Sequence, residues 1–136
     1  MLLGIDFGLK RCGIAVTDTN MVIASPLETV PSEQIIHWLN TYCARHHITG
    51  IVLGYPLSID GSDTHITQNV LFFKEALHHE FASIPIYLQD ERYSSQRASN
   101  AIHLAGKKKH AKDKGTVDMV SAAIILQDFL NEQQKN

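Results

Sequence analysis

Residues 2–8, Leu-Leu-Gly-Ile-Asp-Phe-Gly, and residues 12–17, Cys-Gly-Ile-Ala-Val-Thr, are the part of the sequence that decides the fold. Both are short apolar runs that contain or border glycine, which is the pattern of buried strands. Residues 8–11 are short enough to form the turn of an antiparallel hairpin between them. We therefore expect Asp6 to lie in a buried strand, where an ionised carboxylate is unfavourable by several kcal/mol unless it is paired or binds a metal.

Two interpretations of Asp6 are open. An ion pair with Lys10 or Arg11, which follow it closely, would make the carboxylate structural. We favour a functional site, because carboxylates recur in comparable places at Glu91 and Asp118.

The composition predicts one folded domain over residues 1–136, because this length is ordinary for a single core. An apolar content of 44% and a charged content of 19% are those of a globular chain, not a disordered one. The two cysteines, Cys12 and Cys43, lack the spacing of a zinc site or a disulfide framework. Neither a signal peptide nor a membrane-spanning run is evident, so we expect a cytoplasmic protein with no membrane partner.

Hydrophobic periodicity predicts three strands in succession and then strands linked by helices. A third strand is expected at 21–30, with Pro26 marking it as an edge strand, and Ser32 is expected to cap the next helix. The later elements are a strand at 51–54, a helix over 66–81, a strand at 84–88, a helix from Ser94 or Ser95 and a helix that Thr116 opens. This order predicts an α/β fold with a five-stranded mixed sheet, three antiparallel strands and then helix-linked strands, with helices on both faces. It is the layout of the ribonuclease-H-like fold.

Asp6, Glu91 and Asp118 are the candidate catalytic residues. Asp6 lies in the first strand, Glu91 at the end of the fifth strand and Asp118 in the first turn of the last helix. Neighbouring strand residues point to opposite faces, so only one of Asp90 and Glu91 can join Asp6. Taken alone, Asp118 is better explained as compensating the helix dipole.

Together, the three carboxylates predict a nuclease. Clustered carboxylates repel one another unless cations neutralise them, and oxygen ligands without His or Cys suit Mg²⁺ or Mn²⁺. Two such ions about 3.5–4 Å apart can activate water and stabilise the leaving oxygen of a phosphodiester. We therefore expect Asp6, Glu91 and Asp118 to hold one or two Mg²⁺ or Mn²⁺ ions.

A cluster of lysines precedes Asp118, although the net charge of the chain is −2. Glycines at 106 and 115 bracket the cluster, so it is predicted to be a loop. A solvated loop is the simple interpretation, but the nearby acidic site favours phosphate binding. Three further basic residues are close in sequence to Asp6 or Glu91. Together with three lysines of the cluster, they make up the candidate nucleic-acid-binding residues: Lys10, Arg11, Arg92, Lys107, Lys108 and Lys109. For the first three, structural salt bridges are the alternative.

Four blocks of the chain, in order, resemble the YqgF (RuvX) family of ribonuclease-H-like proteins: 4–15; 54–56 with 60–62; 90–95; and 117–118 with 122–127. Members are described as nucleases of pre-16S ribosomal RNA and, earlier, as Holliday-junction resolvases. The resemblance implies that Asp6, Glu91 and Asp118 form a metal-binding acidic site. It implies 5′-end maturation of pre-16S ribosomal RNA, with precursor rRNA rather than branched DNA as the partner, and leaves a homodimer open.

Three other functions stay open. The first is Holliday-junction resolution in DNA recombination and repair, and the second is a non-catalytic RNA-binding role in ribosome assembly on the same fold. The third is ATP binding of the actin and sugar-kinase type, because residues 4–8 also resemble the first phosphate loop of those proteins. That function needs a second lobe, which 136 residues do not supply.

Overall fold

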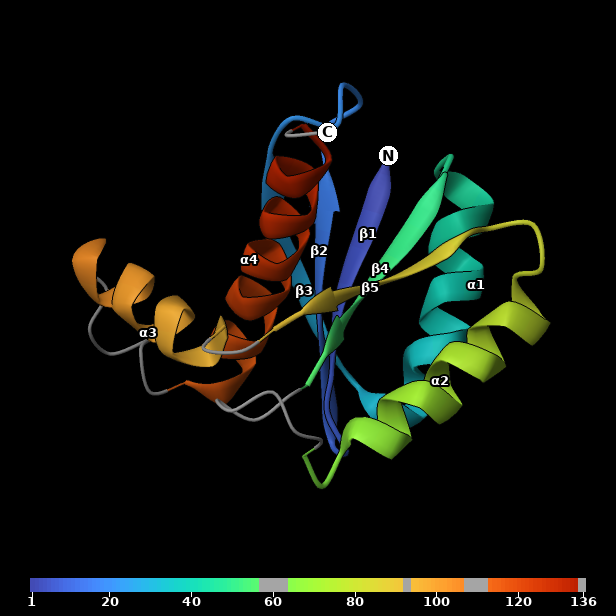
Figure 1. The fold of residues 1–136 in the computed structure, drawn as a ribbon, viewed down its shortest axis with the longest axis horizontal. Helices are drawn as coiled ribbons and strands as arrows, with labels where there is room; N and C mark the ends of the chain where they lie inside the picture. Colours follow the sequence, from blue (N-terminus) through green and yellow to red (C-terminus); the bar gives the residue numbers. More distant parts are fainter. Residues whose placement is uncertain (57–63, 92–93, 107–112, 135–136) are drawn as a thin grey trace.

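A computed structural model of the chain describes residues 1–56, 64–91, 94–106 and 113–134 (Figure 1). Its helices and strands follow the order that periodicity predicts. They are β1 (Leu2–Phe7), β2 (Arg11–Thr17), β3 (Ala24–Pro31), the short 3-10 helix η1 (Ser32–Gln34), α1 (Ile35–Arg45), β4 (Gly50–Tyr55), α2 (Thr67–Glu80), β5 (Ile86–Asp90), α3 (Ser94–Leu104) and α4 (Lys114–Gln134).

The strands form one mixed sheet in the order β3-β2-β1-β4-β5. β2 pairs in antiparallel orientation with both β1 and β3, whereas β4 runs parallel to both β1 and β5. The predicted five-stranded mixed sheet is confirmed, and Pro26 lies on an edge strand as expected.

Helices cover both faces of this sheet, as predicted (Figure 1). α1 and α2 pack on the face into which Leu3 and Ile5 of β1 point. α4 packs on the opposite face, over Leu2 and its neighbours, and α3 packs on α4 rather than on the sheet. Because side chains alternate along a strand, Asp6 points to the face that α4 covers.

Two glycines let α4 come close to the backbone of the sheet. A Cβ atom at Gly4 would lie 2.8 Å from the Cβ atom of Leu126, and one at Gly13 would overlap the main-chain carbonyl of Asp118. Gly13 is also the residue that faces Asp6 across the β1–β2 pair. The missing side chain at Gly13 therefore brings the main chain of Asp118 against the strand pair that carries Asp6.

We expect Gly13→Ala to destabilise the protein by about 1–3 kcal/mol, because the added methyl group meets main-chain atoms that cannot rotate away. Urea unfolding followed by circular dichroism measures this loss. Gly115→Ala in α4 is the matched control, since its Cβ would meet only the Asp113 carboxylate at an ordinary 3.5 Å. A Gly13→Ala protein as stable as the control would show that α4 can move away from the sheet without cost.

Ser32 does not cap a helix, contrary to the prediction. Its hydroxyl donates to the carbonyl oxygen of Gly8 at 2.5 Å, and the residue begins η1 instead. Gln34 precedes α1 without a side-chain cap. The competing acceptor lies 24 residues away in sequence, so a local cap pattern gave no sign of it.

α4 begins at Lys114, two residues before the predicted start at Thr116. Asp113 caps it, because one carboxylate oxygen accepts from the main-chain N–H of Gly115 at 3.1 Å and the other from the hydroxyl of Thr116 at 3.0 Å. Asp118 therefore lies beyond the first turn, and the prediction that it sits in that turn was wrong. Dipole compensation, which is confined to the first turn, loses its basis as an explanation of Asp118.

Two strand boundaries also differ from the prediction. β3 begins at Ala24 because the Asp18 carboxylate accepts from the main-chain N–H groups of Val22 and Ile23 and closes a turn there. β5 runs from Ile86 to Asp90, two residues later than expected, so its end lies directly beside Glu91. Within the described ranges, no helix combines the length and apolar character needed to cross a membrane.

Candidate active site

Of the two neighbouring acids at the end of β5, Glu91 and not Asp90 points to the same side of the sheet as Asp6. Gln89 of β5 faces Gly54 of β4, so the next residue but one, Glu91, points to the same side of the sheet as Gly54 and Asp6. Gly54 makes room for it, since a Cβ there would overlap the Glu91 carboxylate. The main-chain N–H of Glu91 donates to the carbonyl of Tyr55 at 3.3 Å, which ties the residue to the end of β4.

The carboxyl groups of Asp6 and Glu91 lie in hydrogen-bond contact, and both are abnormal acids. Burial, together with the charge of Asp6 and the hydrogen bond to it, raises the pKa of Glu91 to about 10. Burial also raises the pKa of Asp6 to about 6, a rise that the hydrogen bond from Glu91 opposes and the charge of Asp118 increases. The pair therefore holds a proton at neutral pH unless a cation replaces it.

Among the described residues, two buried side-chain oxygen atoms have no hydrogen-bond partner. One is Oε2 of Glu91, and the other is the hydroxyl of Ser121, which is 0% exposed on α4. Buried polar atoms are nearly always satisfied, so an unpartnered carboxylate oxygen beside a second carboxylate indicates a missing cation or water. The donor set is all oxygen, which fits Mg²⁺ or Mn²⁺.

Asp118 faces the same cleft, but its carboxylate is turned to Arg11. Arg11 Nε donates to Asp118 Oδ2 at 2.8 Å, and both side chains are partly exposed, at 38% and 22%. Arg11 is thus occupied by a residue 107 positions away rather than by its neighbour Asp6. In this arrangement, no three His, Cys, Asp or Glu side chains of the described residues converge closely enough to hold a metal ion.

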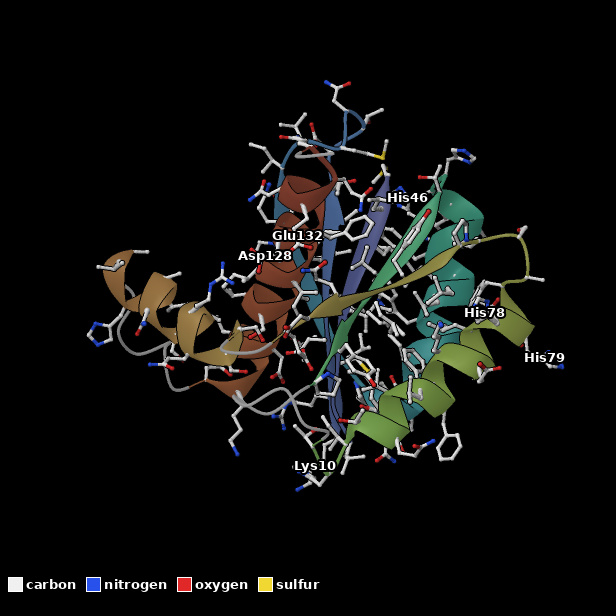
Figure 2. The ribbon with its side chains drawn as sticks, in the orientation of Figure 1. Lys10, His46, His78, His79, Asp128 and Glu132 are labelled. Carbon is white, nitrogen blue, oxygen red and sulfur yellow. The ribbon has the colours of Figure 1, made fainter. Side chains whose placement is uncertain are left out.

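A cleft of about 370 Å³ opens in front of the acidic residues. Its walls combine two carboxylates with basic side chains from three separate segments of the chain. The lining residues are Asp6, Gly8, Leu9, Lys10, Arg11, His65, Ile66, Lys114 and Asp118. Figure 2 shows Lys10 at the end of the molecule where the chain enters α2. The positive charge of these groups favours an anionic polymer in the cleft beside the carboxylates.

Four of the predicted nucleic-acid-binding residues, Arg92, Lys107, Lys108 and Lys109, lie outside the described residues. Lys10 and Arg11 line the cleft. Sequence reasoning missed two cleft residues, His65 and Lys114. Lys114 belongs to the lysine cluster but is the first residue of α4, and His65 has no motif that would single it out from the eight histidines of the chain.

The fold is shared with Holliday-junction resolvases of known structure. The T. thermophilus RuvC structure in complex with Holliday junction substrate has a TM-score of 0.60 at 15% identity, covering 98% of this chain and 94% of that one. The fowlpox virus resolvase bound to Holliday junction DNA has a TM-score of 0.54 at 10% identity, with 97% of both chains covered. These likenesses define the class as a ribonuclease-H-like α/β fold, as predicted.

The chain belongs to the RuvX family, whose profile, described as Holliday junction resolvase, matches residues 1–132. A relative from Amoebophilus asiaticus is 38% identical over 136 residues, covering 99% of this chain and 96% of the relative. Another from Porphyromonas gingivalis is 38% identical over 135 residues, covering 98% of each. Both carry the name "Putative pre-16S rRNA nuclease". The predicted family is confirmed, and the enzyme class is that of a nuclease, a hydrolase of phosphodiester bonds.

Proposed function

We propose that this chain is a divalent-metal-dependent nuclease that acts in the cytoplasm on precursor 16S ribosomal RNA, in the maturation of its 5′ end. The observation that carries the proposal is the buried Asp6–Glu91 pair, which has an unpartnered carboxylate oxygen and whose Asp6 lines a cleft together with basic groups. The names of the full-length relatives support precursor rRNA as the substrate.

Asp6, Glu91 and Asp118 are the residues that would hold the metal. A bound Mg²⁺ or Mn²⁺ supplies activation of water and neutralisation of charge on the phosphate. Burial and the neighbouring acids raise the pKa values of Asp6 and Glu91, and a cation bound between the two carboxylates would offset both effects. The acidic residues thus fit the metal in chemistry, and Arg11 occupies only one oxygen of the Asp118 carboxylate.

Arg11 has two roles in this proposal. With no substrate bound, its guanidinium pairs with the Asp118 carboxylate and offsets that negative charge. This limits the repulsion between Asp118 and the buried Asp6–Glu91 pair. Arg11 also lines the cleft, where its planar guanidinium donors would suit a phosphate of the substrate. Lys10 and Lys114 bind the backbone on either side as point charges.

The decisive experiment compares two substrates with one protein preparation. A precursor 16S RNA fragment that spans the 5′ end and a four-way DNA junction are incubated with Mg²⁺, with Mn²⁺ and with EDTA. Metal-dependent shortening of the RNA at its 5′ end, with an intact junction, supports the proposal. Cleavage of the junction alone makes the chain a resolvase, and no cleavage of either substrate contradicts the nuclease function.

Lys10→Ala combined with Lys114→Ala should weaken RNA binding in low salt. Each lost phosphate contact reduces the magnitude of the slope of log K against log salt by roughly 0.7. The slope for the double variant should therefore be smaller in magnitude by about 1.4 units. Fluorescence anisotropy with single-stranded RNA from low to moderate salt measures the slope. Arg45→Ala on α1, which lines a different groove, is the control. An unchanged slope would place the phosphate contacts elsewhere in the chain.

A further inference from the structure

His65 lies on the wall of the acidic cleft, just before the start of α2. It shares this cleft with Asp6 of β1 and Asp118 of α4, and with the basic residues Lys10 and Lys114. Its side chain is exposed, and no hydrogen bond in the described part of the chain holds its ring. The imidazole is therefore available to a ligand that enters the cleft.

The main chain on both sides of His65 is held firmly. The hydroxyl of Thr67 donates to the carbonyl of Pro56 at 2.6 Å, and that of Thr64 donates to the same carbonyl at 3.1 Å. The main-chain N–H of Thr64 in turn donates to the hydroxyl of Thr67 at 2.8 Å, and Thr67 is only 1% exposed. These bonds fasten the start of α2 to the residue that follows β4.

This fastening fixes where His65 stands relative to the acidic pair. β4 also carries Gly54, against which the Glu91 carboxylate lies, so the segment that holds His65 and the Glu91 carboxylate are both placed against the end of β4. An exposed side chain on a main chain anchored this closely is typical of a binding residue, because the anchored main chain contributes little entropy to the cost of binding.

We propose that His65 is a substrate-binding residue whose imidazole N–H donates a hydrogen bond to a phosphate of the RNA next to the scissile bond. This inference rests on the proposed function and specifies how the same cleft holds its substrate. Lys10, His65 and Lys114 line the same cleft as Asp6 and Asp118, so they are available to the phosphates that flank the reacting one. Among these three, His65 supplies a directional donor on a short side chain, which restricts the path of the backbone more than a lysine does.

The test measures binding without cleavage and without metal. In the Asp6→Asn background and in EDTA, His65→Ala should weaken binding of a short single-stranded RNA about tenfold, the effect of one hydrogen bond to a charged group. His65→Gln, which keeps an N–H donor, should stay within about threefold of the parent. His78→Ala is the control, because His78 is exposed near the far end of α2 (Figure 2).

Equal affinity of His65→Ala and the parent would overturn the proposal. The proposal would also be overturned if His65→Gln lost as much RNA affinity as His65→Ala and both variants had a lower melting temperature. That result would show a structural role for His65. With Asp6 intact and Mn²⁺ present, His65→Ala should raise KM and leave kcat within about twofold. A protein that binds RNA through His65 yet cleaves nothing would contradict the nuclease function while leaving this contact established.

Discussion

Asp6→Asn should reduce the rate of metal-dependent RNA cleavage by about a thousandfold or more. The change removes a charged ligand from the site where a cation would contribute several kcal/mol of transition-state stabilisation. The amide has nearly the same shape, so circular dichroism should show an unchanged fold. Gel analysis of a precursor RNA fragment with Mn²⁺ measures the rate.

Glu75→Gln is the control for this variant, because Glu75 is an exposed carboxylate on α2 that takes no part in the cleft. It should cleave at the rate of the parent, which rules out a general effect of lost negative charge. Cleavage by folded Asp6→Asn at a rate near that of the parent would remove Asp6 from the site and leave the buried acidic pair without a catalytic role.

Glu91→Gln should make the metal-free protein more stable than the parent at pH 8, by about 2 kcal/mol. The parent must keep a proton on the buried pair or bear an unpaired charge there, and an uncompensated buried charge costs roughly 3–5 kcal/mol. The neutral amide avoids both costs. Urea unfolding in EDTA at a series of pH values measures the difference.

The sign of the pH dependence follows from the direction of the shift. The pKa of Glu91 rises from 4.5 to about 10, so the folded state binds this proton more tightly than the unfolded chain. The contribution is fully present below pH 4.5 and is lost as pH rises toward 10. The parent should therefore lose stability across this window in EDTA, and Glu91→Gln should lose less.

Added Mn²⁺ supplies the internal check on this prediction. It should raise the stability of the parent, because a ligand that binds the folded state alone stabilises it. It should stabilise Glu91→Gln far less. A variant that is no more stable than the parent without metal would mean that the buried carboxyl pair is not unfavourable, and the pair would then give no support to a cation site.

The parts of the site that could be predicted from the sequence are those that depend on local pattern. Asp6 stands out because a charge interrupts an aliphatic run, and the alternation of side chains along β5 limits the second acid to Asp90 or Glu91. The mixed five-stranded sheet follows in the same way, since hairpin spacing and amphipathic helices leave few topologies.

The remaining features depend on contacts between distant segments. The sequence predicts that Arg11 pairs with Asp6 or binds a phosphate. In the structure it donates to Asp118, which the packing of α4 on β2 brings near. Ser32 has the local pattern of a cap, but a carbonyl from the β1–β2 turn competes successfully for its hydroxyl. His65 joins the cleft only because two threonines fasten the start of α2 beside it.

The close fit of α4 on its glycine-lined sheet has a consequence for how the enzyme acquires activity during folding. α4 contacts β1 and β2, which lie about a hundred residues earlier in the chain, so its docking requires closure of a very long loop. The single tryptophan, Trp38, lies on α1 and packs with the core on the opposite face. Tryptophan fluorescence thus reports on one face of the sheet during refolding, and recovery of RNA cleavage reports on the other. Under the proposed function, a chain in which only the first face has formed would lack Asp118 beside Asp6, and we expect no RNA cleavage from it.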